Sequence, residues 1–331
     1  HKEYRRQRQM CIRDRVNINS EKKELIMTTR TSMIALLFLV LLLVFSPLAK
    51  AEDSPNLLGR LISDWPQLPL GKNFGPTTGV GVDSKNNVYV YHRGPQTVMC
   101  FDAEGKFLRS WGDGILSSPH GLAVDSQDNV WVTDIGSHTV IKFSSKGRTL
   151  MVLGRKDTSG ETNDTFNQPT HVAFGPKGET YITDGYGNSR VVKYSKEGEY
   201  LHSWGKKGKA PGEFNAPHTI AVDHEGKVYV GDRENHRIQI FDENGKFLKE
   251  WTHLGSPWGL YFSSDQHLFM CDGYKNRILK LDLQGRILGT LGKAGKQPGN
   301  LYFSHHLAIS KTGELYVAEV GNWRVQKFLL K

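Results

Sequence analysis

The sequence predicts an all-β fold, a six-bladed β-propeller, from three observations. One pattern recurs six times along the chain, turn residues divide each copy into four short strands, and the last copy lacks its fourth strand. A segment near the N-terminus has the pattern of that missing strand. Four-stranded units repeated around a closed ring are typical of a propeller, and six copies predict six blades.

The six copies align on one position just after their first strand. Each copy continues with a turn, an alternating strand, a turn resembling D-x-x-N-x-R, a third strand, a D-x-x-G-K turn and a strand that ends in Trp or Leu-Gly. The aligned positions are 42, 50, 48, 40 and 47 residues apart, at Asp83, Asp125, Gly175, Asp223, Ser263 and Ser310.

The two ends of the repeat region predict how the ring closes. The sixth copy stops at Lys331, after its third strand, whereas residues 59–65 (GRLISDW) have the pattern of a fourth strand. We expect this N-terminal strand to pair with the strand at 324–328 and complete the last blade. Closure of this kind leaves no sheet edge exposed to aggregation.

The residues before the propeller domain, which we place at 52–331, predict export. Residues 33–45 are thirteen consecutive apolar residues, too few for the roughly 20 that span a bilayer, and an A-K-A sequence ends at residue 51. This pattern indicates a signal peptide at 27–51, hence a secreted or periplasmic protein without a membrane anchor after cleavage. Residues 1–26 match neither part and are interpreted as an upstream extension.

Charge and cysteine content exclude several classes of protein. Of the net charge of +9, residues 1–51 contribute +6 (10 Lys/Arg, 4 Asp/Glu), and the other 280 residues contribute +3 (33 against 30). The basic character therefore does not predict a nucleic-acid partner. Three cysteines are too few for a disulfide scaffold, and Cys100 and Cys271 fall in strands of non-neighbouring copies, as separate thiols. A closed ring predicts a monomer.

One column of the alignment predicts a metal site. Five residues before the aligned position, successive copies have Thr78, His120, Thr170, His218, Trp258 and His305. The innermost strands of a propeller line its axis, so histidines in alternate blades converge about 120° apart. Three imidazoles with one open position are a ligand set of catalytic zinc.

The alternative is that polar residues line a water-filled channel without any metal. Histidine makes up about 4% of the chain (13 of 331 residues), so three in alternating register argue against coincidence. We expect the remaining histidines near this column to be surface or channel residues: His138, His171, His236 and His306.

Loops after the second strands should surround the same point, and they contain Arg93, Tyr186 and Arg233. Two guanidiniums facing a cation predict an anion between them, such as a substrate carboxylate. Tyr274 repeats the setting of Tyr186, so packing is an alternative role for a tyrosine there. Four aspartates in these loops are expected to form turns: Asp134, Asp184, Asp232 and Asp272.

The combination of PHGLA, DGYGNSR, PHTIAVD with DREN, and HRG resembles the peptidyl-α-hydroxyglycine α-amidating lyases, a family of secreted six-bladed propellers with NHL repeats. The resemblance implies cleavage of the N–C bond of a C-terminal α-hydroxyglycine, giving an amide and glyoxylate. It implies zinc at the three histidines, Tyr186 and Arg93 as catalytic residues, Arg233 as the ligand of the substrate carboxylate, and Phe303 at a substrate contact.

The chain also departs from the family pattern. The resemblance implies a calcium ion on the backbone carbonyls of Val80 and Leu122 and on an acidic residue after the third histidine, but His306 stands at that place. Gly187 replaces a cysteine, and Ser304 replaces a proline. Two other functions stay open at this stage: a non-catalytic exported binding propeller, and a calcium lactonase, which would need carboxylate and amide ligands at the axis.

Overall fold

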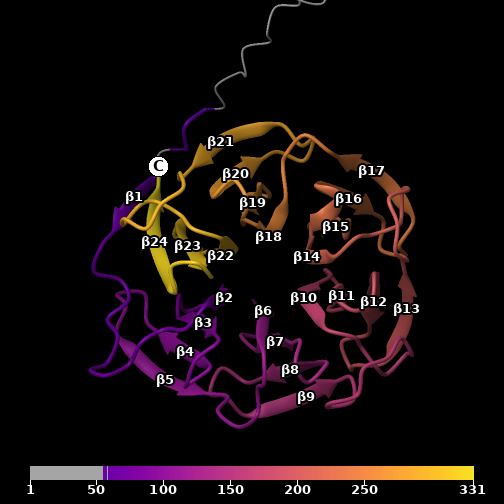
Figure 1. The fold of residues 1–331 in the computed structure, drawn as a ribbon, viewed down its shortest axis with the longest axis horizontal. Coiled ribbons are helices and arrows are strands. Elements are labelled where there is room, and N and C mark those ends of the chain that lie inside the picture. The colour runs from indigo at the N-terminus through magenta and orange to yellow at the C-terminus, as the bar shows by residue number, and fades with distance from the viewer. Residues whose placement is uncertain (1–54, 58) are drawn as a thin grey trace, which may run out of the picture. The chain divides into compact units, whose positions relative to one another are not determined.

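The computed structural model describes residues 55–57 and 59–331, which form a six-bladed β-propeller, as predicted (Figure 1). Each blade is a four-stranded antiparallel sheet. The segments predicted as an upstream extension (1–26) and a signal peptide (27–51) lie outside the described residues. Within the described part, no helix has the length and apolar character needed to cross a membrane.

The strands of the first three blades are, in blade 1, β2 (Thr77–Val82), β3 (Val88–His92), β4 (Val98–Phe101) and β5 (Phe107–Trp111); in blade 2, β6 (Pro119–Val124), β7 (Val130–Asp134), β8 (Thr139–Phe143) and β9 (Thr149–Leu153); and in blade 3, β10 (Pro169–Phe174), β11 (Thr180–Asp184), β12 (Arg190–Tyr194) and β13 (Tyr200–Trp204).

The strands of the other three blades are, in blade 4, β14 (Pro217–Val222), β15 (Val228–Asp232), β16 (Arg237–Phe241) and β17 (Phe247–Trp251); in blade 5, β18 (Pro257–Phe262), β19 (Leu268–Asp272), β20 (Arg277–Leu281) and β21 (Ile287–Leu291); and in blade 6, β22 (Ser304–Ile309), β23 (Glu314–Glu319), β24 (Arg324–Leu330) and β1 (Gly59–Ile62).

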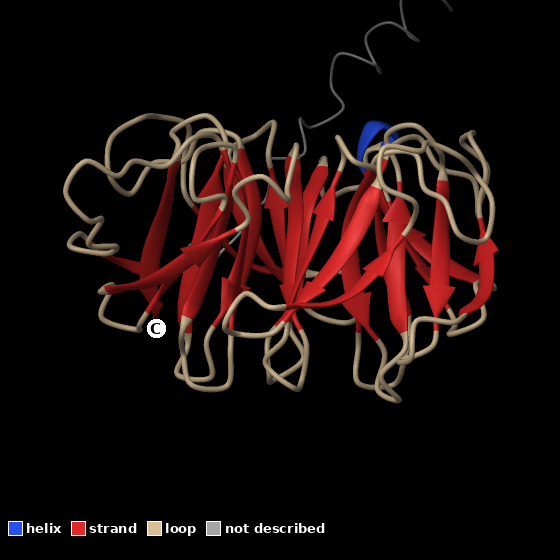
Figure 2. Ribbon diagram, turned by 90° about the horizontal axis from the view of Figure 1, so that it is seen from below, coloured by secondary structure: helices blue, strands red, loops and turns tan. Residues whose placement is uncertain are grey.

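The two faces of the propeller contain different loops. The starts of the first strands and the loops between second and third strands lie at one face, which we call the η1 face after the 3-10 turn found there, η1 (Arg233–Asn235) (Figure 2). The hairpin turns between first and second strands lie at the opposite face. In blade 1 such a turn is closed by Asp83, whose carboxylate accepts hydrogen bonds from the backbone N–H groups of Lys85 and Asn87.

The hydrophobic core of the described part is divided into six clusters, one between each pair of neighbouring blades. Because each blade packs on both sides, its second strand is buried throughout, and the usual alternation of buried and exposed residues is lost there. The fourth strands keep exposed residues because they form the outer rim. Cys100 and Cys271 are buried in different clusters as separate thiols, as predicted.

The ring closes as the sequence predicted. Strand β1 pairs antiparallel with β24, with Gly59 opposite Leu330 and Ile62 opposite Lys327. The strand ends at Ile62, three residues before the predicted boundary, and Trp65 continues the chain into the core between blades 6 and 1. Its ring packs edge-on against Tyr316, at a centroid distance of 4.9 Å.

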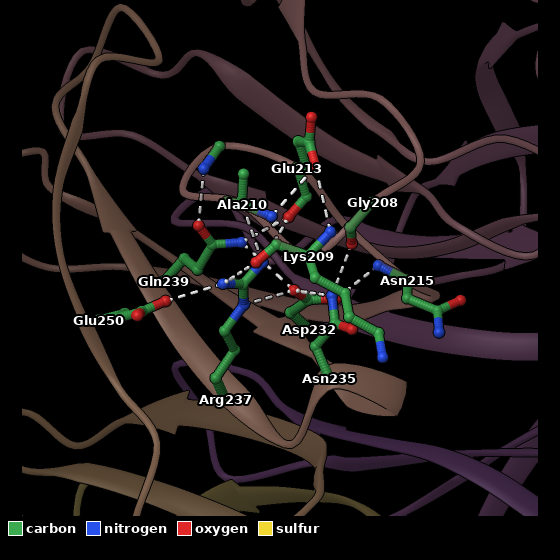
Figure 3. Close-up of polar contacts among 11 residues, drawn as sticks. Gly208, Lys209, Ala210, Glu213, Asn215, Asp232, Asn235, Arg237, Gln239 and Glu250 are labelled. Atoms are coloured by element: carbon green, nitrogen blue, oxygen red, sulfur yellow. Dashed lines mark hydrogen bonds and ion pairs between the residues drawn. The ribbon is translucent and has the colours of Figure 1, made fainter.

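Buried ion pairs fasten the loops of the η1 face. In blade 4, Asp232 accepts hydrogen bonds from Arg237 Nε (2.8 Å) and from the backbone N–H of Asn215 in the preceding loop (2.7 Å) (Figure 3). Arg237 also donates to the backbone carbonyls of Lys209 (2.7 Å) and Glu213 (2.8 Å). Each such pair ties two loops to the end of the second strand.

The same pair recurs in four consecutive blades, and we call these pairs the acid–arginine clusters. They comprise Asp184 with Arg190, Asp232 with Arg237, Asp272 with Arg277, and Glu319 with Arg324. The aspartates predicted as turn formers therefore do more than form turns. In blade 2, Asp134 binds only backbone N–H groups, such as those of Ser117 and Ser118, and in blade 1 His92 replaces the acid.

Candidate metal centre

A β-bulge at the start of the first strand in every blade positions the centre. In blade 6, Ser304 pairs with Glu319 and His306 with Ala318, so His305 has no partner in the ladder. A bulge of this kind re-aims the side chain of the extra residue. The residues bypassed in this way form the axial column: Thr78, His120, Thr170, His218, Trp258 and His305.

The three histidines of the axial column meet on the axis. The ring centroids of His120 and His218 are 4.7 Å apart, those of His120 and His305 4.7 Å, and those of His218 and His305 4.9 Å. One ligand atom from each ring lies within 4.8 Å of the others, and all three side chains are buried. The structure thus brings together the three residues predicted as metal ligands.

Hydrogen bonds to the next blade fix the orientation of each ring. His120 Nδ1 lies 2.7 Å from the carbonyl of Thr170, His218 Nδ1 2.7 Å from that of Trp258, and His305 Nδ1 2.6 Å from that of Thr78. Because a carbonyl oxygen only accepts, each Nδ1 is the protonated nitrogen. In a neutral ring Nε2 therefore has the lone pair, which is the form that binds metals.

Burial keeps these rings neutral. Desolvation is the main cause of a pKa of about 3 for His120; the hydrogen bond to Thr170 opposes this shift, and the charges of Arg93 and Arg233 add to it. Desolvation likewise holds the pKa of His218 and His305 well below the usual value, with His120 as the next contribution in each case. Three neutral imidazoles with converging lone pairs therefore fit a divalent cation such as zinc.

The hydroxyl of Tyr186 lies at the same point. Its oxygen is 2.9 Å from His120 Nε2 and 3.0 Å from His218 Nε2, and Arg233 Nη1 donates a hydrogen bond to it at 3.0 Å. Tyr186 follows β11, and the next residue, Gly187, packs closely against Asn167. A Cβ on Gly187 would lie 2.0 Å from Asn167 Cγ, so a side chain at this position would have to displace the Asn167 amide group.

Arg233 is held between two aromatic rings. Its guanidinium carbon lies 5.2 Å from the ring centroid of Tyr186 and 5.1 Å from that of Trp258. Its Nε donates to Glu234 Oε1 at 2.8 Å. The neighbouring carboxylate thus occupies one side of the guanidinium, while Nη1 faces the tyrosine and the histidines.

Arg93 and Phe303 lie at the rim of the centre. Arg93 is exposed after β3, its Nε donates to the carbonyl of Pro119 at 3.0 Å, and its charge acts on His120 and His305. Phe303 precedes β22 in a left-handed conformation (φ 50°) and stacks on Trp258 at 5.7 Å. The chemical roles of these residues stay predictions.

Trp258 and Glu234 also belong to the site, although the sequence predicted a role for neither. Trp258 forms an aromatic wall that contacts His218, His305 and Phe303 and supports the Arg233 guanidinium. The alignment could have pointed to Trp258, because it is the one position of the axial column that has neither threonine nor histidine. Glu234 had no distinguishing signal, because its pairing with Arg233 depends on the geometry of η1.

Calcium does not fit the place that the family resemblance implies. The Val80 carbonyl accepts a hydrogen bond from His306 Nδ1 at 3.2 Å. A cavity of about 270 Å³ surrounds Val80 and Leu122, and none of the described residues that line it has a carboxylate. Calcium prefers oxygen ligands that include carboxylates, so no calcium ligand set is present here.

Known proteins resemble this chain both in its repeat and over most of its length. The NHL repeat model matches residues 116–143 and 214–241. Human NHL repeat-containing protein 3 is 34% identical over 298 residues, covering 83% of this chain and 85% of that protein. The probable peptidyl-alpha-hydroxyglycine alpha-amidating lyase pgal-1 of Caenorhabditis elegans is 30% identical over 300 residues, covering 78% of this chain and 84% of that protein.

A third relative is much longer than this chain. Peptidyl-glycine alpha-amidating monooxygenase B of Xenopus laevis is 31% identical over 310 residues, covering 80% of this chain and 35% of its own length. The chain therefore spans about a third of that relative. Among solved structures, a streptogramin B lyase has a TM-score of 0.59 at 16% identity, covering 83% of this chain and 98% of its own, which shows a shared fold alone.

The architecture and the repeat match define an NHL-repeat six-bladed propeller with three histidines on its axis. Within that class, the chain belongs to the family that includes the peptidyl-α-hydroxyglycine α-amidating lyases, as the sequence motifs predicted.

Proposed function

We propose that the protein is a secreted, zinc-dependent carbon–nitrogen lyase that cleaves a peptidyl or N-acyl α-hydroxyglycine into an amide and glyoxylate. One observation supports this most directly: the Tyr186 hydroxyl contacts two histidines of the axial column and the guanidinium of Arg233 at a single point. Kinship with amidating lyases supports the class of reaction.

The three histidines of the axial column would hold the zinc ion through Nε2. A zinc ion bound there supplies Lewis-acid polarisation of an oxygen ligand. The Nδ1 hydrogen bonds to the next blades keep the rings aimed at the axis and in the correct tautomer.

Arg233 would orient the substrate by its carboxylate. The planar guanidinium suits a bidentate contact with a carboxylate, and the rings of Tyr186 and Trp258 fix its plane. Glu234 occupies Nε, and Nη1 already donates to the Tyr186 hydroxyl, so the substrate carboxylate would share Nη1 with the tyrosine and use Nη2. Phe303 would contact the substrate from the adjacent wall.

Tyr186 would act as the general base. Tyr186 would take this role as the phenolate: the substrate hydroxyl gives its proton to the phenolate oxygen, the carbon–oxygen double bond of glyoxylate forms, and the carbon–nitrogen bond breaks. The proton then passes to the departing amide nitrogen, so neither water nor a redox partner is consumed. Arg93 would stabilise the negative charge that develops on oxygen.

The setting of this reaction follows from the sequence. The apolar segment at 33–45 and the A-K-A site support export, and the carboxylate-binding arginine favours a small-molecule or peptide substrate with a C-terminal carboxylate. The closed ring supports a monomer, and the small net charge of the residues after 51 gives no support to a nucleic-acid partner.

The test is release of glyoxylate from an N-acyl α-hydroxyglycine by purified protein, before and after zinc is removed with a chelator. We expect turnover that is lost with zinc and restored by zinc. A folded, zinc-loaded protein that is inactive on every α-hydroxyglycine would overturn the lyase and favour a non-catalytic binding propeller. Hydrolysis of a lactone run in parallel, with calcium required, would favour a lactonase.

A further inference from the structure

A second layer of histidines lies on the axis, next to the first. His171 of β10 in blade 3 and His306 of β22 in blade 6 come from opposite sides of the ring, yet their ring centroids are only 4.3 Å apart. Each follows a residue of the axial column, and each side chain is 4% exposed. The two rings therefore meet in the interior of the propeller.

Each ring of this pair contacts the backbone of the next blade through Nδ1. His306 Nδ1 lies 3.2 Å from the carbonyl of Val80, whereas His171 Nδ1 lies 3.2 Å from the carbonyl of Ile220 and also accepts from the Ile220 N–H at 3.4 Å. Both Nε2 atoms are buried and have no hydrogen-bond partner among the described residues. A buried polar atom without a partner is costly, so a ligand or a water molecule is expected between the rings.

Two glycines make room for the rings. A Cβ on Gly121 would lie 2.8 Å from His171 Cδ2, and a Cβ on Gly259 would lie 2.9 Å from His306 Cα. Any side chain at these positions would displace an imidazole or its strand. A cavity of about 270 Å³ is lined by both histidines and by apolar strand residues such as Val124 and Phe262.

We infer that His171 and His306 bind a second divalent metal ion of the class that prefers imidazole, such as zinc, copper(II) or nickel(II), through their Nε2 atoms. Two nitrogens and no carboxylate select this class over calcium and magnesium. Water from the cavity completes the coordination. The site is separate from the three-histidine centre, and the inference does not depend on the proposed lyase activity.

The stoichiometry of metal binding tests this site. The full chain is stripped with a chelator, titrated with zinc sulfate and desalted, and the bound zinc is measured by mass spectrometry. We expect two zinc ions per wild-type chain, one in His171→Ala and His306→Ala, and one in His218→Ala. The matched control, His224→Ala, removes an exposed imidazole that pairs with Gln266 and should keep two. Calcium chloride at millimolar concentration should displace neither ion.

A measurement on the wild-type chain covers the case in which an alanine variant does not fold. With two equivalents of copper(II), electron paramagnetic resonance should show a second signal with hyperfine coupling to two imidazole nitrogens. One zinc ion per wild-type chain, two ions in both alanine variants, or a second copper signal with oxygen ligands alone would each overturn the site. The first of these results would leave a bridging water between the rings.

Discussion

The acid–arginine clusters and the axial column lie at the same face of the same blades, yet they vary differently around the ring. The clusters repeat in four consecutive blades with the same ion pair at the end of the second strand. The axial column changes at every step, with imidazoles only in blades 2, 4 and 6. The repeated ion pairs stabilise individual blades, whereas the alternating histidines of the axial column together form one metal centre on the axis.

The largest effect is expected from removing one member of the axial column. His218→Ala should abolish metal binding at the three-histidine centre and all glyoxylate release, because the centre loses one of its three protein ligands. Metal content and activity are measured together. His267→Ala, which removes a half-buried histidine paired with Asp265, should change neither. An active His218→Ala protein would contradict the assignment of the column.

Tyr186→Phe tests whether the tyrosine beside the three-histidine centre is a catalytic residue. Loss of a general base typically lowers kcat about 10²- to 10⁴-fold, while zinc binding should persist because no ligand is removed. The control is Tyr274→Phe, which alters the equivalent loop tyrosine of blade 5, and it should stay within about twofold. Equal effects of the two substitutions would indicate packing rather than catalysis.

Arg237→Ala tests the repeated pairs. It leaves the Asp232 carboxylate buried without its ion pair, and burial already raises the pKa of that carboxyl. We expect the free energy of unfolding to fall by about 3–5 kcal/mol in urea titrations. Arg286→Ala removes an exposed partner of Asp282 and should cost less than about 1 kcal/mol. Similar losses of unfolding free energy in both variants would show that the acid–arginine clusters stabilise the fold no more than exposed ion pairs do.

Arg233→Ala should weaken substrate binding more than turnover, because a carboxylate contact is made equally in the ground and transition states. A lost charge-assisted hydrogen bond of about 1.5–3 kcal/mol predicts a rise in KM of roughly 10- to 150-fold. Arg233→Lys should be intermediate, since it keeps the charge without the planar fork. A fall in kcat with unchanged KM would assign Arg233 to the chemical step.

The smallest effect is expected at His92, which replaces the repeated acid in blade 1. Burial lowers its pKa to about 4, so between about pH 6.5 and 4 the unfolded chain binds a proton that the folded protein does not. Stability is therefore lost as the pH falls through this range. His92→Gln should reduce the slope of unfolding free energy against pH by at most about 1.4 kcal/mol per unit. An unchanged slope would contradict this.

The fold was predictable because the repeat exposes both its period and its missing strand. The axial column was predictable as well, since one alignment position samples the same place in every blade. The contact between His171 and His306 was not: both were expected at the surface or in the channel, and no pairing between them was predicted. Neighbouring residues of a regular strand point to opposite faces, so a regular strand would not place both His305 and His306 at the axis. The bulge, which has no sequence signature of its own here, brings both to the axis.

Other parts of the site were hidden because they depend on side-chain geometry. The ion pair between Arg233 and Glu234 requires the short turn of η1, and neighbours in sequence seldom pair in this way. Trp258 occupies the axial column visibly, but its contact with the Arg233 guanidinium depends on how blades 4 and 5 adjoin.

The seam between β1 and β24 has a mechanical consequence. Gly59 lies opposite Leu330, so the start of the first strand and the end of the last strand are neighbours at the same end of the sheet. A force that pulls these two ends apart would break the hydrogen bonds between the strands one after another rather than all at once. The pairing of β1 with β24 can form only after the ribosome has synthesised β24. Strand β1 is synthesised before the other strands of the propeller, so it stays unpaired until β24 is available.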